Sequence, residues 1–102
     1  MAVYLKVHNS YRKVIALCDI NLIGKKFYEG NLQLDLKEDF YKGDKMEDEE
    51  VIAFLKEAAI EDATFNIVGE KSIELALKSG IIEKSENSII KKQNIPHALS
   101  LI

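Results

Sequence analysis

Apolar residues recur at two spacings along this chain of 102 residues, and the spacings predict alternating strands and helices. In VYLKVH, residues 3–8, apolar and polar side chains alternate, which is typical of a strand with one buried face. VIALC, residues 14–18, is apolar throughout. We therefore expect a central strand that is covered on both faces and pairs with the first strand as an N-terminal hairpin.

Further strands are predicted along the rest of the chain. Leu alternates with polar residues over residues 31–36, and TFNIV, residues 64–68, is a short apolar run. We expect the connection between these two segments to be a right-handed crossover between parallel strands, because such connections nearly always have that hand. SII, a turn around Asn94 and Pro96, and ALSLI are expected to complete the sheet.

Two main helices are predicted between these strands. Apolar side chains repeat at helical spacing over residues 46–59, and Asp44 with Glu47 resembles a capping box at the start of that segment. The second helix is expected to follow Gly69 and to stop at Gly80, because glycine tolerates the dihedral angles found at helix boundaries.

A short helix, INLI, is predicted between Asp19, which would cap it, and Gly24, which would end it. The order of elements gives the fold class as α/β (α+β). We expect a mixed β-sheet of about five or six strands, packed by the two main helices. With 102 residues, the chain is long enough to form a single compact domain over residues 1–102 without disulfides.

The composition narrows the class of protein. Cys18 is the only cysteine and ends an apolar run, so we interpret it as a small buried hydrophobic residue, which fits a reducing compartment. No stretch approaches the roughly 18 apolar residues of a membrane span, and the first residues lack the apolar core of a secretory signal. We therefore expect a soluble cytoplasmic protein with no membrane partner.

Charge is distributed unevenly along the chain. The formal net charge is -3, but residues 37–62 hold ten of the 17 acidic and four of the 14 basic residues. This segment therefore carries -6 and the remainder carries +3. A solvated acidic helix explains the pattern, and an acidic flank that orients a basic binding face is the alternative.

The stretch NIVGEKS, residues 66–72, resembles the end of a phosphate-binding loop, but its spacing does not fit one. Such a loop needs a glycine five residues before its second glycine and a lysine directly after it. Around Gly69 these two places hold Thr64 and Glu70. We therefore exclude a nucleoside triphosphate site of that type.

A weaker candidate site for an anion remains at the same place. Gly69, Lys71 and Ser72 could offer backbone amides, a cation and a hydroxyl at a helix N-terminus. The alternative is structural: Gly69 supplies the turn from strand to helix, and Glu70 stabilises the positive end of the helix.

The two histidines by themselves form neither a set of metal ligands nor a set of catalytic residues. His97 follows Pro96 at an expected chain reversal that would hold its ring, and histidine suits proton transfer near neutral pH. A ring that is hydrogen-bonded to a nearby carbonyl group is the structural alternative. One cysteine and two distant histidines match no metal-ligand spacing, so we predict no metal and no cofactor.

Three segments together resemble a known family. DINLIGKKFYEG, NIVGEKSIELALKSGII and IPHA occur in this order, and the chain is similar over nearly its whole length to an archaeal family of small uncharacterised proteins, domain of unknown function 424. The resemblance implies an archaeal cytoplasmic protein and no defined activity. The matching residues are Asp19, Leu22, Gly24, Lys25, Phe27, Glu29, Gly30, Asn66, Gly69, Glu70, Ser72, Pro96 and His97.

Two functions from different classes follow from these residues. The first is a binding module for RNA or a ribonucleoprotein partner, with aromatic rings on bases and lysines on phosphates, namely Lys25, Lys26, Lys71, Lys91 and Lys92. The second is a small enzyme or a protein that binds an anionic ligand, with a polar cluster of Asp19, Lys25, Glu70, Ser72 and His97. Convergence of that cluster in one cleft favours the second, and a face carrying the lysines favours the first.

Overall fold

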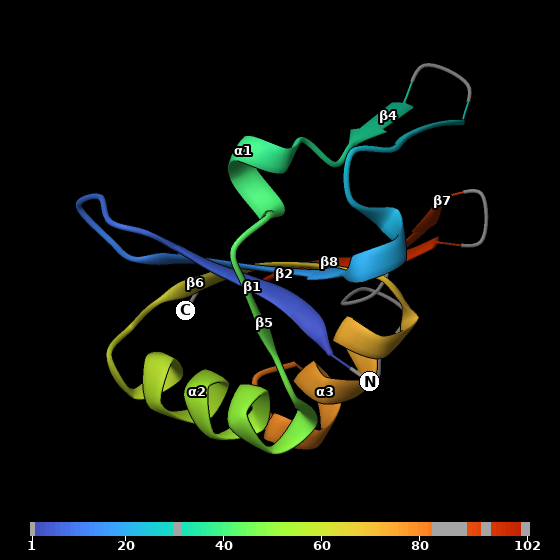
Figure 1. Ribbon diagram of the computed structural model, residues 1–102. Helices are drawn as coiled ribbons and strands as arrows, with labels where there is room; N and C mark the ends of the chain where they lie inside the picture. The colour runs from blue at the N-terminus through green and yellow to red at the C-terminus, as the bar shows by residue number, and fades with distance from the viewer. Residues whose placement is uncertain (1, 30–31, 83–89, 93–94, 101–102) are drawn as a thin grey trace.

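A mixed sheet with the strand order β5-β1-β2-β6-β8-β7 forms the centre of the molecule (Figure 1). The computed structural model describes the backbone of residues 2–29, 32–82, 90–92 and 95–100, and the side chains of residues 2–26 and 35–82. The strands are β1 (Val3–His8), β2 (Val14–Asp19), β5 (Asp44–Met46), β6 (Thr64–Val68), β7 (Ile90–Lys92) and β8 (Ile95–Ser100). β2 and β6 are parallel, and the other neighbours are antiparallel.

The N-terminal hairpin and the central place of its second strand are confirmed. β1 pairs with β2 in antiparallel register from Val3 opposite Asp19 to His8 opposite Val14. Successive residues of β2 enter the cores on opposite faces of the sheet, Ile15 and Leu17 on one face and Ala16 and Cys18 on the other. This explains why the segment is apolar throughout.

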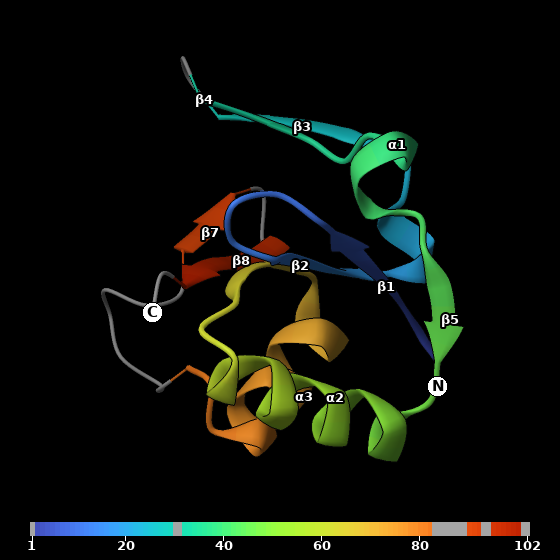
Figure 2. The same ribbon diagram turned by 90° about the vertical axis from the view of Figure 1, so that its left-hand side faces the viewer.

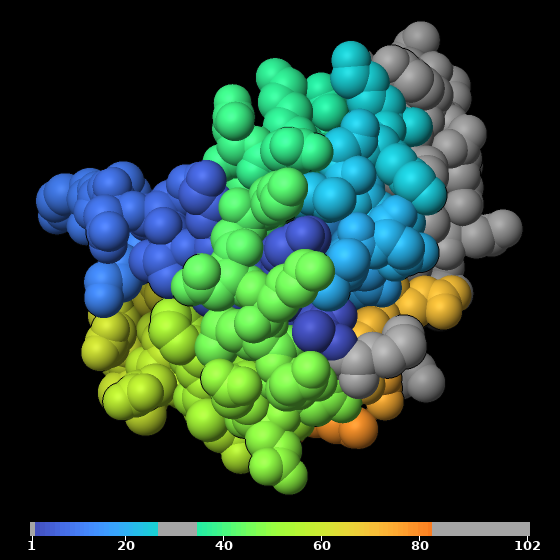
Figure 3. Space-filling model, viewed as in Figure 1, coloured from blue at the N-terminus to red at the C-terminus, as the bar shows by residue number. Residues whose placement is uncertain are grey.

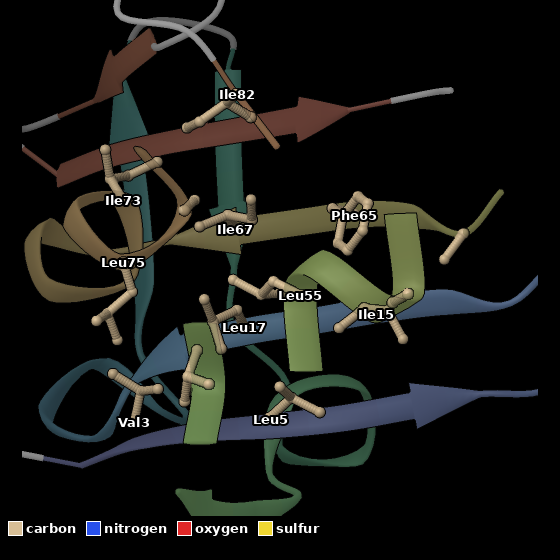
Figure 4. Packing of buried hydrophobic residues seen from close by; sticks show 14 residues of the cluster. Val3, Leu5, Ile15, Leu17, Leu55, Phe65, Ile67, Ile73, Leu75 and Ile82 are labelled. Carbon is tan, nitrogen blue, oxygen red and sulfur yellow. The ribbon is translucent and has the colours of Figure 1, made fainter. Parts of the chain in front are cut away.

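The two long helices cover one face of the sheet (Figure 2). They are α2 (Asp48–Ile60) and α3 (Glu70–Ser79), and the buried stripe of α2 packs against side chains from β1, β2 and β6 (Figure 4). The mixed α+β fold with two main helices is thereby confirmed. Within the described part of the chain, no helix is both long and apolar enough to cross a membrane.

The opposite face carries a second, smaller layer (Figure 1). It contains the 3₁₀ helix η1 (Ile20–Leu22), the short helix α1 (Glu38–Tyr41) and a two-stranded ribbon of β3 (Lys26–Glu29) and β4 (Leu32–Asp35). Its buried core consists of Ala16, Cys18, Leu22, Leu36, Tyr41 and Val68.

The expected crossover from residues 31–36 is wrong. The ladder of β4 is formed with β3, outside the main sheet, and the parallel neighbour of β6 is β2. A strand at 26–29 was not predicted, so the local partner of β4 was missed. Hairpin pairing closes a short loop and therefore costs less chain entropy than pairing with a distant strand.

The expected capping box is also wrong. Asp44 begins the edge strand β5, where it lies opposite Leu5 of β1, and α2 starts later, at Asp48. Pairing with β1 draws the chain into an extended conformation that a local capping pattern does not reveal. The first turn of α2 is acidic and complements the positive end of the helix dipole.

At the C-terminal end, Pro96 and His97 lie within β8 and not at a chain reversal, which corrects the expectation. β8 starts at Ile95, and Pro96 lies opposite Lys91 of β7. The ladder between β8 and β6 ends at the pair His97 and Val68, so Pro96 lies beyond the end of β6. Proline has no backbone N–H to donate, and it fits at this position because only β7 pairs with β8 here. Asn94 and residues 88–89 of SII lie outside the described residues.

Replacing the buried Leu55 by Ala is expected to lower the free energy of unfolding by about 2–5 kcal/mol, because it removes apolar atoms and leaves a cavity between α2 and the sheet. Ile60→Ala, on the same helix, is the matched control, since Ile60 is 83% exposed and its change should stay within about 0.5 kcal/mol. Urea unfolding followed by circular dichroism measures both values. Equal losses in the two variants would contradict the packing described for α2.

Candidate functional site

Two strands of the sheet end side by side at the start of α3. β2 and β6 are parallel, and their last paired residues are Cys18 and Val68. Asp19 follows the first of these residues and Gly69 follows the second. Parallel strands bring their carboxyl ends to one edge of a sheet, so Asp19 lies beside Gly69 and therefore next to the N-terminus of α3.

The carboxylate of Asp19 caps α3. It accepts the backbone N–H of Lys71 at 3.1 Å and that of Ser72 at 2.8 Å, and the Ser72 hydroxyl donates to it at 2.7 Å. These amides have no partner within the helix itself, and a negative charge at this end is favoured by the helix dipole. The helix is thus capped by a residue 52 positions before Lys71, and not by the adjacent N-cap residue as is usual.

Gly69 is required by this arrangement for two reasons. Its φ is +110°, a conformation that side chains rarely adopt, and its ψ is 156°. A Cβ atom at Gly69 would lie 2.2 Å from Cγ of Asp19 and 2.5 Å from each carboxylate oxygen. The predicted turn from strand to helix at Gly69 is confirmed, and the missing side chain also leaves space for the cap.

The predicted role of Asp19 as the cap of INLI is wrong. Asp19 precedes η1, but its side chain makes no capping hydrogen bond to that element. The carboxylate points to α3 because the helix offers two backbone amides and a hydroxyl there. The amides of Lys71 and Ser72, which the sequence offers to an external anion, therefore already hold an internal one.

The ammonium group of Lys71 is engaged with the acidic first turn of α2. Its Nζ lies 2.7 Å from Oδ2 of Asp48 and 3.5 Å from Oε2 of Glu74. The hydrogen bond between Lys71 and Asp48 lowers the pKa of Asp48 and raises that of Lys71. Sequence reasoning missed Asp48 as a partner of Lys71, because the two lie on different helices and only the packing of α2 beside α3 brings them together.

A hollow of about 480 Å³ adjoins the cap. Glu70 is exposed there, in the first turn of α3, where a negative charge also complements the helix dipole. The residues that line the hollow are Ala2, Asp19, Ile20, Asn21, Glu70 and Lys71.

The predicted polar cluster is brought together only in part. Asp19, Glu70 and Ser72 meet at the start of α3. Lys25 does not line the hollow. Its backbone N–H donates to the carbonyl oxygen of Leu22, and its carbonyl oxygen accepts the N–H of Leu36, so it connects η1 to the base of the ribbon. The backbone of His97 lies in β8 opposite Val68, just before Gly69, and its side chain is outside the described part.

Cys18 is buried beside this site, between β1 and β6. Burial, with a further contribution from the charge of Asp19, raises the pKa of its thiol to about 12. Burial and the neighbouring Cys18 likewise raise the pKa of Tyr41 to about 12. A thiol that stays protonated is a poor nucleophile, and Cys18 packs as a buried residue of the second core.

Removal of the Asp19 carboxylate in Asp19→Ala is expected to lower the free energy of unfolding by about 2 kcal/mol, because the donors of α3 lose their acceptor. Gly69→Ala should cost about 1 kcal/mol or more through its positive φ alone, with an added collision with Asp19. In a double-mutant cycle, Gly69→Ala should cost less in the Asp19→Ala background, since that background removes the colliding atoms. Strictly additive losses, measured by urea unfolding, would contradict the contact.

Alkaline pH is expected to destabilise the protein through Cys18. Below its ordinary pKa of 9.0 the thiol is protonated in both the folded and unfolded states, so its full contribution to stability is present. As the pH rises from about 9 toward about 12, the thiol ionises in the unfolded chain first and stability falls. Urea midpoints across this range, compared with those of Cys18→Ala, measure the effect. A variant with the same alkaline loss as the parent protein would exclude Cys18 as a source.

Comparisons with known proteins agree with the resemblance seen in the sequence. A comparison with proteins of curated function finds no match. The chain is similar to the protein described as "Crystal structure of an uncharacterized conserved protein from Methanopyrus kandleri", an archaeon. The two share 27% sequence identity and a TM-score of 0.88, covering 100% of this chain and 92% of the other. Residues 7–101 match the family described as "Protein of unknown function (DUF424)", and because this match spans nearly the whole chain, the protein belongs to the DUF424 family.

Proposed function

We propose that this protein is a binding module for RNA, and that it contacts the phosphates at the edge of the molecule where β3 lies beside β7. The observation that carries the proposal is the contact between these two strands, which are more than 60 residues apart in the sequence. We call this surface the lysine edge and define it by Lys25, Lys26, Lys91 and Lys92.

Two segments that are distant in sequence supply the residues of the lysine edge. Lys25 directly precedes β3 and Lys26 opens it, and both side chains are exposed. Lys91 and Lys92 form the end of β7, which is the outermost strand of the sheet on that side. Contacts of several lysines with phosphates provide affinity that does not depend on base sequence.

Acidic residues near and far from the lysine edge limit where RNA would bind. Asp48, Glu49 and Glu50 begin α2, which lies on the opposite face of the sheet from the ribbon (Figure 2). Closer to the edge, Asp35 lies opposite Lys26 within the ribbon and reduces its local charge. The acidic start of α2 repels a polyanion from the helical layer. On the other side of the sheet, Glu38 and Asp39 of α1 lie near Lys26, so RNA would bind along the lysine edge itself and not across α1.

Lys71 does not belong with the other lysines that the sequence predicts to bind phosphate. Its ammonium group lies between Asp48 and Glu74, so contact with RNA would require breaking an ion pair. The proposal therefore concerns the four lysines of the lysine edge.

A small enzyme or an anion-binding protein is the competing function, with its site at the hollow beside α3. The amides that would hold an anion there already bind Asp19, and Lys71 is paired. Glu70 adds a further negative charge to the lining. An anionic ligand would have to displace a carboxylate of its own charge, so the hollow supports this function less well than the lysine edge supports RNA binding.

Charge reversal of the lysine edge is expected to weaken RNA binding. In Lys91→Glu/Lys92→Glu, affinity for a single-stranded RNA at low salt should fall, because phosphates that the two lysines neutralise would face carboxylates instead. The slope of log K against log salt should become less steep by about 0.7 for each phosphate that the protein no longer neutralises. Fluorescence anisotropy of labelled RNA over a series of salt concentrations measures both quantities.

The matched control is Lys56→Glu/Lys78→Glu, which makes the same change of charge on exposed residues of α2 and α3. This control should reduce affinity much less, because its residues lie on the helical layer. Equal losses in the two double variants would show that net charge alone governs binding. Absence of RNA binding by the parent protein at low salt would exclude the proposed function.

A further inference from the structure

The hairpin between β1 and β2 ends in a loop that projects from the sheet, and the tyrosine in this loop is fully exposed. The projection is visible on the left of the molecule (Figure 3). Tyr11 lies in the loop at residues 9–13 and has a relative exposure of 106%. The other tyrosines whose side chains are described, Tyr4 and Tyr41, are each only 8% exposed.

The exposure of Tyr11 is not explained by the needs of the fold. A buried aromatic ring stabilises a protein through the apolar area that it removes from water, and a fully exposed ring removes none. Tyr11 also has no place in either core cluster of described residues. The ring is therefore available for contact with another molecule.

The base of the loop is anchored to the sheet. The carbonyl oxygen of Lys13 accepts the backbone N–H of Thr64 at 2.9 Å, and Val14 continues into the ladder with β6. The chain is thus held directly after the loop by the central strands. A ring carried on an anchored hairpin loses little conformational freedom when it binds.

Two cationic residues follow Tyr11 directly. Arg12 is exposed, and Lys13 has a side chain that is 52% exposed, with its Nζ 3.5 Å from Oε2 of Glu61. Glu61 is itself 57% exposed, so this is a surface ion pair of small strength. An aromatic ring next to cations is the combination that binds unpaired nucleotides, with stacking on the base and charge on the phosphate.

We infer that Tyr11 is a stacking platform for one unpaired base of a single-stranded RNA, with Arg12 and Lys13 beside the adjoining phosphates. This inference rests on the proposed function and adds a second contact to it. A base inside a duplex has its faces covered by its neighbours, so the platform selects single strands.

The hairpin loop and the lysine edge lie at opposite ends of the sheet. The ladder of β2 and β6 begins next to the hairpin loop, where Val14 lies opposite Thr64. It ends at Cys18 opposite Val68, and Val68 lies opposite His97, in the part of β8 that pairs with β7. The longest extent of the molecule is 36 Å. An RNA that touches both places therefore crosses the whole protein, and a short oligonucleotide can occupy one place without the other.

A fluorescent variant tests stacking directly. The chain contains no tryptophan, so Tyr11→Trp introduces a single indole at the tip of the hairpin. Its fluorescence should be quenched by an unstructured oligouridine and much less by a duplex of equal length. Heparin, which carries charge but no bases, should not quench it. Equal quenching by heparin and oligouridine would overturn the stacking platform.

Affinity measurements test the contribution of the ring. Tyr11→Ser should weaken binding of single-stranded RNA by about 5- to 100-fold, and Tyr11→Phe should bind nearly as well as the parent protein. Neither change should alter the melting temperature, since the ring is outside the core. Ile60→Ser is the matched control, because Ile60 is the other large apolar residue described as exposed and lies on α2.

The outcomes separate this inference from the proposed function. If the parent protein binds RNA and Tyr11→Ser binds equally well, the stacking platform is wrong and the lysine edge stands. If Tyr11→Ser and Ile60→Ser lose affinity alike, the ring has no specific role and the inference is again overturned. If the parent protein binds no RNA, both proposals fail together.

Discussion

The capping of α3 by Asp19 is the interaction on which the arrangement of this protein depends. It joins the end of a central strand to the start of a helix through three hydrogen bonds to one carboxylate. It can form only because β2 and β6 are parallel and end together, and because Gly69 has no side chain in the space that the carboxylate fills. Loss of this cap would leave the amides of Lys71 and Ser72 without their acceptor, and α3 would then be held by its buried residues Ile73, Leu75 and Ala76 and by the salt bridge of Lys71 with Asp48.

The same interaction decides what the N-terminus of α3 can do. A free helix N-terminus attracts anions through its amides and its dipole. Here an internal carboxylate holds those amides and a salt bridge holds the nearby cation. The motif that resembles a phosphate loop in the sequence therefore connects the sheet to α3 in the folded protein, and the surfaces left for a ligand are the other layer and the edges of the sheet.

The two faces of the sheet carry different elements. The acidic start of α2 lies on one face, whereas the ribbon and the second core lie on the other, and β7 of the lysine edge is the last strand of the sheet itself (Figure 2). The proposed RNA would approach the side away from α2, where the strands β3 and β7, distant in sequence, lie in contact. An exposed aromatic ring at the opposite end of the sheet would add contact with bases, which charge alone does not provide.

By itself, the sequence determined the features that depend on local periodicity and on backbone preference. The alternation of β1, the uninterrupted apolar run of β2 and the stripe that includes Leu55 each report burial of nearby residues, and Gly69 marked a turn that only glycine makes easily. Only the tertiary structure decided that β2 is the parallel neighbour of β6, that Asp44 extends the sheet and that Asp19 caps α3. Each of these depends on a contact between residues far apart along the chain, whose free energy is set by the complete packing and leaves no local pattern.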